Sequence, residues 1–121
     1  MGLNLDPGIK AYIDQATALY DDEAAHGSLA AQRQAYLDLC RAFAKPHPTG
    51  VSASDRLIDA DGRDIPVRVY RPASNTVLPC VLFFHRGGWV VGNLDSHDSI
   101  AADICGRNGA VVIAVNYRLA P

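Results

Sequence analysis

The sequence predicts an α/β fold in which helices come first and a small sheet follows. Three observations lead to this prediction: a helical repeat over residues 6–44, a two-residue repeat over residues 54–70, and a strand–helix–strand pattern over residues 80–115. At 121 residues, the chain is long enough for one small domain and too short for two well-formed ones.

The first stretch predicts two helices. Asp6 is suited to cap the first helix, and Pro7 fits its first turn, where no N–H donor is required. Apolar side chains then recur on one helical face until Gly27, which favours a helix end. Ser28 can cap a second helix that runs to residue 44, because the prolines of Lys45-Pro-His-Pro48 cannot continue it.

Residues 54–70 predict a β-hairpin with one buried face. Apolar and polar side chains alternate along this stretch, which is the period of a half-buried strand. Asp61-Gly62 interrupts the alternation, and this dipeptide is typical of tight hairpin turns.

Residues 80–115 predict one strand–helix–strand unit with parallel strands. Residues 80–84 and 110–115 are continuously apolar, which is typical of strands covered on both faces. A glycine-containing loop at 85–93 follows the first strand. Asp95 or Ser96 can then cap a helix that places Asp98 near the positive end of its dipole and ends at Asn108-Gly109.

Composition and charge argue against several classes of function. Hydrophobic residues make up 49% of the chain and charged residues 20%, as in ordinary soluble globular proteins. With 11 basic and 13 acidic residues, the net charge is −2, and there is neither a basic stripe for nucleic acid nor a polybasic segment for anionic lipid. The longest apolar runs are strand-sized, so we expect no membrane span.

The cysteines and the N-terminus favour a cytoplasmic protein. Cys40, Cys80 and Cys105 are odd in number and widely spaced, so neither a disulfide framework nor a zinc site is indicated. The first residues lack a positively charged segment followed by a long apolar one, so no secretory signal is expected.

The strongest chemical signal is the glycine loop that follows the first apolar strand, His85-Arg86-Gly87-Gly88-Trp89. In acyl transfer, the tetrahedral intermediate carries negative charge on the former carbonyl oxygen, and two backbone N–H groups must point at that oxygen. Glycines let the main chain approach it and adopt unusual φ values. This loop resembles the oxyanion loop of lipases and esterases.

Other motifs agree with that loop in order and spacing. Val69-Tyr-Arg-Pro72 precedes it, and Asp95-Ser-His-Asp98 and Val115-Asn-Tyr-Arg-Leu-Ala-Pro121 follow it. Together they resemble the N-terminal part of carboxylesterases of the hormone-sensitive-lipase type. The resemblance implies an α/β-hydrolase fold, no cofactor and no metal, and carboxylic esters of short or medium acyl chains as substrates.

The resemblance also implies how the chain is divided. Residues 1–48 correspond to a helical cap-like segment, and residues 49–121 to the first strands of the core, oxyanion loop included. The family's strand order of 1-2-4-3 places the hairpin at one side and residues 80–84 beyond residues 110–115. In the 121 residues alone, that third strand would be an open edge, through which we expect pairing with a second copy.

The resemblance makes Gly87 and Gly88 the oxyanion donors and gives His85 a supporting role in the loop. Arg86 departs from the family pattern, which usually has glycine there. The arginine adds bulk and charge beside the donors and disfavours a positive φ. We therefore expect Arg86→Gly to relax the loop and raise the kcat of a longer enzyme.

A second departure is the absence of a nucleophile elbow. No Gly-x-Ser-x-Gly occurs in the 121 residues, and each serine lacks the flanking glycines: Ser28, Ser52, Ser54, Ser74, Ser96 and Ser99. In the family the order is serine, then acid, then histidine, so all three would lie beyond Pro121. We therefore expect a truncated ester hydrolase that is inactive alone, acting on a carboxylic ester only if completed by the missing part.

Several alternatives remain open at this level. A glycine pair by itself favours a simple turn, and Asp98 beside His97 is explained by its place at a helix start without any catalytic pairing. The chain can also be a non-catalytic small-molecule binder on the same scaffold, as the plant gibberellin receptors are, or a fragment with no independent function. A binder needs an enclosed pocket, and a ligand-dependent melting shift would distinguish it from a fragment.

Overall fold

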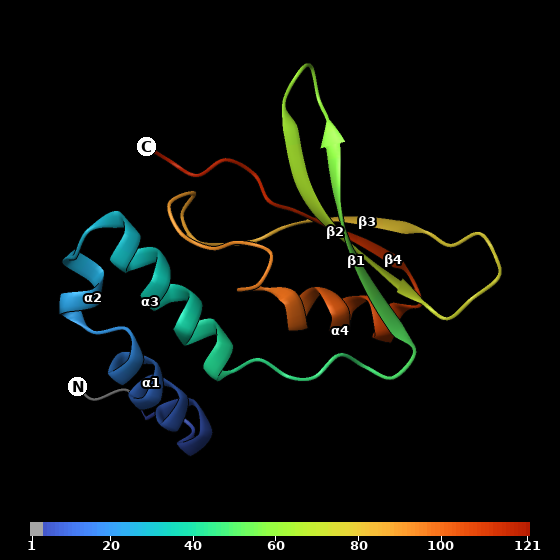
Figure 1. Cartoon of the computed structure of the whole chain (residues 1–121). Coiled ribbons are helices and arrows are strands. Elements are labelled where there is room, and N and C mark those ends of the chain that lie inside the picture. Colours follow the sequence, from blue (N-terminus) through green and yellow to red (C-terminus); the bar gives the residue numbers. More distant parts are fainter. Residues whose placement is uncertain (1–3) are drawn as a thin grey trace.

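The computed structural model describes residues 4–121 and confirms the α/β class. Its elements are α1 (Pro7–Leu19), α2 (Asp22–His26), α3 (Leu29–Ala42), β1 (Val51–Asp59), β2 (Asp64–Pro72), β3 (Cys80–Phe84), α4 (Asp98–Asn108) and β4 (Val111–Val115). The four strands form one sheet in the order β1-β2-β4-β3. Figure 1 shows α4 along one face of this sheet, and α1 to α3 as a separate helical group beside the N-terminal end of α4.

The helical segment begins as predicted but divides differently. Asp6 caps α1 by accepting a hydrogen bond from the Gly8 N–H at 2.8 Å, and Ser28 caps α3. The chain leaves the helix at Tyr20, where the sequence predicts no break, so there are three helices rather than two. Asp21 explains the extra helix, because its carboxylate accepts from the Ala24 N–H at 2.8 Å and starts α2.

The hairpin turn is confirmed. β1 and β2 are antiparallel over their whole length, and Ala60 and Arg63 exchange two backbone hydrogen bonds of 2.8 and 3.2 Å. Between them, Asp61 and Gly62 both have positive φ, at 54° and 77°. This is the geometry of a two-residue turn that matches the twist of the flanking strands.

The expectation that one face of the hairpin is buried is wrong. β1 is exposed along nearly all its length because it lies at an edge of the sheet. β2 lies between β1 and β4 and is buried on both faces, with Val67 on one and Tyr70 on the other.

The strand–helix–strand unit is confirmed, with β3 and β4 parallel. The core packs Tyr70 and Val112 of the sheet against Ala101, Ala102 and Cys105 of α4. The expectation that residues 80–84 are covered on both faces is wrong. Phe83 is half-buried, and the other four residues of β3 are exposed. The reason is that α4 packs against β4, β2 and β1, and leaves the outermost strand uncovered.

The start of α4 also differs from its prediction. The helix begins at Asp98, and the residue before it, His97, makes no side-chain capping bond. Asp95 and Ser96 lie in the preceding turn, where Ser96 Oγ bonds to the backbone of Asn93. The helix ends as predicted at Gly109, which has a φ of 59°. Within residues 4–121, no helix has the length and apolar character needed to cross a bilayer.

Candidate active site

The loop of residues 85–93 leaves the carboxyl end of β3 and makes a tight, strained turn. Gly87, Gly88 and Trp89 have consecutive positive φ values of 137°, 58° and 61°. The Gly87 carbonyl accepts hydrogen bonds from the N–H groups of Val90 and Val91, at 3.1 and 3.0 Å. Backbone strain of this kind persists where the surrounding structure enforces it, and it concentrates at functional sites.

The same turn leaves two donors free. Among the residues described, none accepts a hydrogen bond from the N–H of Gly87 or Gly88. Both glycines border a cavity of about 410 Å³, which is completed by Phe84, Trp89 and Tyr117 with the backbone of the loop. Successive N–H groups in a turn of positive φ form a concavity suited to an anionic oxygen.

The glycines at 87 and 92 are required by space as well as by φ. A Cβ on Gly87 would lie 2.0 Å from the Val91 carbonyl oxygen, which is backbone and cannot move aside. A Cβ on Gly92 would lie 2.5 Å from Nδ1 of His85. Gly88 differs, since a Cβ there would meet no atom within 4 Å.

His85 lies inside the loop and is 5% exposed. Its Nδ1 is 2.9 Å from the Arg86 carbonyl oxygen, and the Tyr117 hydroxyl donates to the His85 carbonyl at 2.6 Å. The two rings stack with centroids 4.4 Å apart. The Nε2 atom of His85 is buried and has no hydrogen-bond partner among residues 4–121.

A second set of contacts ties the loop to distant parts of the chain. Arg33 of α3 donates from Nε to the Val90 carbonyl at 2.9 Å and from Nη2 to the Ala120 carbonyl at 3.0 Å. The Ala120 N–H donates in turn to the Trp89 carbonyl at 2.7 Å. Sequence reasoning missed Arg33, although its position three residues before Tyr36 places it on the half-buried side of the helix.

His97 and Asp98 are neighbours in sequence but their side chains do not pair. His97 is buried, and its Nδ1 lies 2.8 Å from Ser96 Oγ. Burial, and then the proximity of His85 and Arg86, lowers the pKa of His97 to about 4. The imidazole is therefore neutral at physiological pH.

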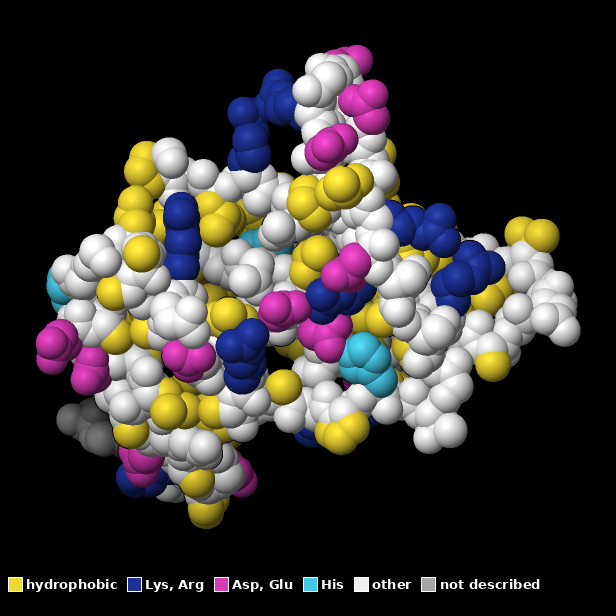
Figure 2. All heavy atoms as spheres, in the orientation of Figure 1, with side chains coloured by type: hydrophobic (Ala, Val, Ile, Leu, Met, Phe, Trp, Pro, Cys, Tyr) yellow, Lys and Arg dark blue, Asp and Glu magenta, His cyan; other side chains and the backbone are white. Residues whose placement is uncertain are grey.

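Asp98 is instead the centre of a polar network between the sheet and the helices. Its carboxylate accepts hydrogen bonds from Tyr70 at 2.7 Å and from Arg68 at 2.9 Å, and it pairs with His47. Arg68 also contacts Asp55 and Asp95. Figure 2 shows acidic and basic side chains gathered beside a histidine where β1 and β2 pass over α4.

The network holds its carboxylate in the charged form. Burial raises the pKa of Asp98, but the hydrogen bonds from Tyr70, His47 and Arg68 outweigh burial and leave that pKa below its ordinary value. Burial and the bond to Asp98 raise the pKa of the Tyr70 phenol. These groups join β2, α4 and the segment before β1, so they stabilise the framework below the loop.

Arg86 does not strain the loop as expected. Only Asp61 and Trp89 have positive φ among the non-glycine residues described, so position 86 needs no glycine. The expectation that Arg86→Gly relaxes the loop therefore loses its physical basis. Arg86 is among the residues that line both the cavity at Gly87 and Gly88 and a second cavity under α1 and α3.

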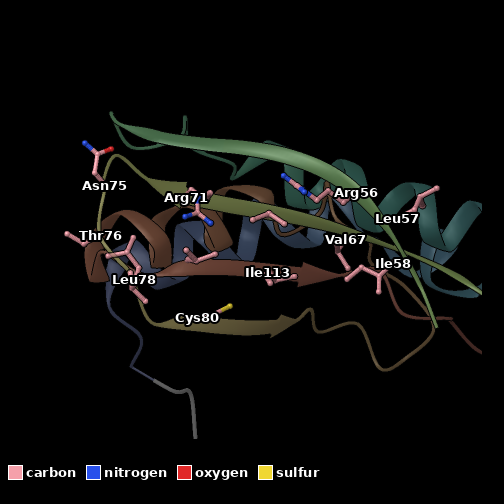
Figure 3. Close-up of a pocket in the computed structure, with 13 residues that line it drawn as sticks. Arg56, Leu57, Ile58, Val67, Arg71, Asn75, Thr76, Leu78, Cys80 and Ile113 are labelled. Atoms are coloured by element: carbon pink, nitrogen blue, oxygen red, sulfur yellow. The ribbon is translucent and has the colours of Figure 1, made fainter. Parts of the chain in front are cut away.

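A larger concavity, of about 920 Å³, lies away from this loop on the face of the sheet opposite α4. Figure 3 shows its lining side chains on the face turned away from α4, with Arg56 on the edge strand β1, Val67 and Arg71 on β2, and Ile113 on β4. It holds no carboxylate, histidine or hydroxyl pair suited to acid–base chemistry, so we place the candidate site at the loop.

Comparison with known proteins agrees with this fold. The sequence pattern of a family described as alpha/beta hydrolase fold matches residues 81–121. Carboxylic ester hydrolase LipN of Mycobacterium tuberculosis is 31% identical over 121 residues, which cover 99% of this chain and 32% of LipN. Carboxylesterase NlhH of the same species is 46% identical over 69 residues, covering 55% of this chain and 22% of NlhH.

A solved structure leads to the same family. The hyperthermophilic esterase of the archaeon Pyrobaculum calidifontis superposes with a TM-score of 0.83 at 30% identity, over 97% of this chain and 37% of that one. The chain spans about a third or less of the curated relatives it matches. The chain therefore has the α/β-hydrolase fold that these carboxylesterases share, and it covers the N-terminal part of that fold.

Proposed function

We propose that this chain provides the oxyanion loop of a carboxylic-ester hydrolase, with Gly87 and Gly88 as the backbone donors. The observation that supports this most is the pair of free N–H groups at the border of a cavity, in a turn of three successive positive φ values. The names of the relatives, carboxylic ester hydrolase and carboxylesterase among them, support the same reaction class.

The loop geometry fits the charge that develops in ester hydrolysis. Attack on the ester carbonyl converts its oxygen to an anion, and donors that are already in place stabilise that anion without reorganising. The Tyr117 hydroxyl fixes the start of the loop through the His85 carbonyl. Arg33 and the Ala120 N–H fix its later part through the carbonyls of Val90 and Trp89. The attacking serine, the base and the acid come from residues beyond this chain's 121.

An open cavity favours this role over that of a small-molecule binder. Trp89 is 74% exposed and Phe84 is 59% exposed, so a molecule at the loop would stay partly open to solvent on the side of these residues. Small-molecule pockets usually bury most of the ligand surface. A carboxylic ester as the substrate, and a second copy of the chain along the exposed β3 edge, are the partners we expect.

A chimera tests the proposal. Residues 1–121 are joined to the C-terminal part of LipN, because LipN aligns over the whole of this stretch. We expect the chimera to hydrolyse p-nitrophenyl butyrate, and residues 1–121 alone to show no turnover above a matched protein blank. Gly87→Ala should lower the kcat of the chimera by about 10²- to 10³-fold, the usual effect of misplacing one donor.

Gly62→Ala is the matched control, because Gly62 also has a positive φ but lies on the hairpin turn with open space around it. The control should retain most of the kcat. A folded chimera without activity, or an active one that tolerates Gly87→Ala, would refute the role of this loop. Saturable turnover by residues 1–121 alone would show that a nucleophile within them has been overlooked.

A further inference from the structure

Arg86 lines two of the cavities next to the loop, and among residues 4–121 no other lysine, arginine, aspartate or glutamate lines either of these two. The first cavity is the one of about 410 Å³ at Gly87 and Gly88. The second, of about 180 Å³, lies between the helices α1 and α3 and the start of α4, and includes Tyr12, Phe43 and Ser99. Arg86 is the residue that these two cavities share.

The Arg86 guanidinium has no acidic partner within the described part of the chain. Neighbouring arginines differ, since Arg41 lies 3.7 Å from Asp95 and Arg68 contacts three carboxylates. Two of the polar groups facing Arg86 are His97, whose pKa lies at about 4, and Ser96, so neither brings a compensating negative charge. The remaining neighbours are apolar side chains, Tyr12 and Ser99 of the same cavity, Cys40, and the Tyr36 phenol, which is hydrogen-bonded to Arg86.

The charge of Arg86 also reaches α3. Burial raises the pKa of the Tyr36 phenol and of the Cys40 thiol, and the positive charge of Arg86 opposes the rise in each. Both groups are thus neutral at physiological pH and leave the guanidinium uncompensated. Arg86, which has no acidic partner, directly precedes the two free backbone donors in the chain, and no acidic residue among those described lines either cavity, so the site is positively polarised.

We propose that Arg86 makes this site selective for anionic esters, namely half-esters of dicarboxylic acids. The ester carbonyl would lie at the N–H groups of Gly87 and Gly88, and the free carboxylate would pair with the Arg86 guanidinium, which can bind it through two parallel N–H bonds. The inference rests on the proposed function, because it names the substrate class of the same loop.

Binding to the 121-residue chain tests this without any need for turnover. Trp89 is the sole tryptophan, and it borders the cavity, so its fluorescence reports on occupancy. The probes are monomethyl succinate, which carries one carboxylate, and dimethyl succinate, its neutral counterpart. Isothermal titration calorimetry on the same samples detects binding that does not change the tryptophan fluorescence.

We expect monomethyl succinate to bind about fivefold more tightly than dimethyl succinate, as one partly exposed ion pair provides. Arg86→Gln should abolish that preference. Arg63→Gln on the hairpin turn should retain it, because Arg63 lies outside both cavities. Equal affinities in the unmodified chain, absence of binding by both methods, or a preference that survives Arg86→Gln would each overturn the inference.

The binding experiment and the activity of the chimera test different claims. The activity of the chimera on neutral p-nitrophenyl butyrate tests only the role of the oxyanion loop. An active chimera combined with equal affinities for the two succinates would overturn the selectivity and leave the hydrolase. An inactive chimera would overturn the hydrolase, while the two affinities would still decide whether Arg86 recognises a carboxylate.

Discussion

The exposed edge strand β3 predicts that this chain associates with itself. β3 pairs with β4 on one side, and no strand of residues 4–121 covers its other side. Leu82 and Phe84 on this strand are 61% and 59% exposed. An apolar strand with unpaired N–H and C=O groups is a template for a second strand, so we expect dimers or larger species joined edge to edge.

Replacing Leu82 with lysine should weaken that association strongly. Fully burying a leucine side chain contributes about 1.5–3 kcal/mol, and three-fifths of Leu82 remains to be buried, which leaves about 1–2 kcal/mol per copy. A symmetric dimer contains the residue twice, so Leu82→Lys should cost about 2–4 kcal/mol. This corresponds to a rise in the dimer Kd of roughly 30- to 700-fold.

Size-exclusion chromatography with light scattering over a range of concentrations measures the effect. Leu57→Lys is the matched control, because Leu57 is 66% exposed on β1 at the opposite edge of the sheet. We expect the Leu57 variant to associate like the unmodified chain. A monodisperse monomer at high concentration, or a larger effect from Leu57→Lys, would refute the reasoning about β3.

Three further predictions concern stability, each measured by urea unfolding followed by circular dichroism. Because the pKa of His97 is about 4 in the fold and about 6.5 when unfolded, the unfolded chain binds more protons between these values. Stability should therefore fall by about 2 kcal/mol from pH 7 to pH 5, and an equal loss in His97→Gln would contradict this. Tyr70→Phe should cost about 1.5–3 kcal/mol by removing a hydrogen bond to the charged Asp98, and a neutral effect would show that the bond contributes nothing. Gly87→Ala should destabilise more than Gly88→Ala, since only the former adds a clash with backbone, and the reverse order would mean that the loop geometry is misassigned.

Local features of the fold were predictable because they depend on neighbouring residues. The caps at Asp6 and Ser28 and the turn at Asp61-Gly62 are each decided within a few residues of chain. Burial was not predictable in the same way. The pattern of residues 80–84 gives the strand, but whether it is covered depends on where α4 lies and on its place at the sheet edge.

For the candidate site too, the local features were predictable from the sequence and the contacts between distant residues were not. The sequence motif identifies Gly87 and Gly88, because glycine is the residue that positive φ demands. It says nothing of Arg33, which contacts the loop from 57 residues earlier in the chain. Since Arg33 lies in α3 and donates to the Val90 carbonyl of the loop, a shift of α3 would move a contact next to the two donors. The helix α3, which precedes the sheet in the chain, is therefore part of what positions the free N–H groups.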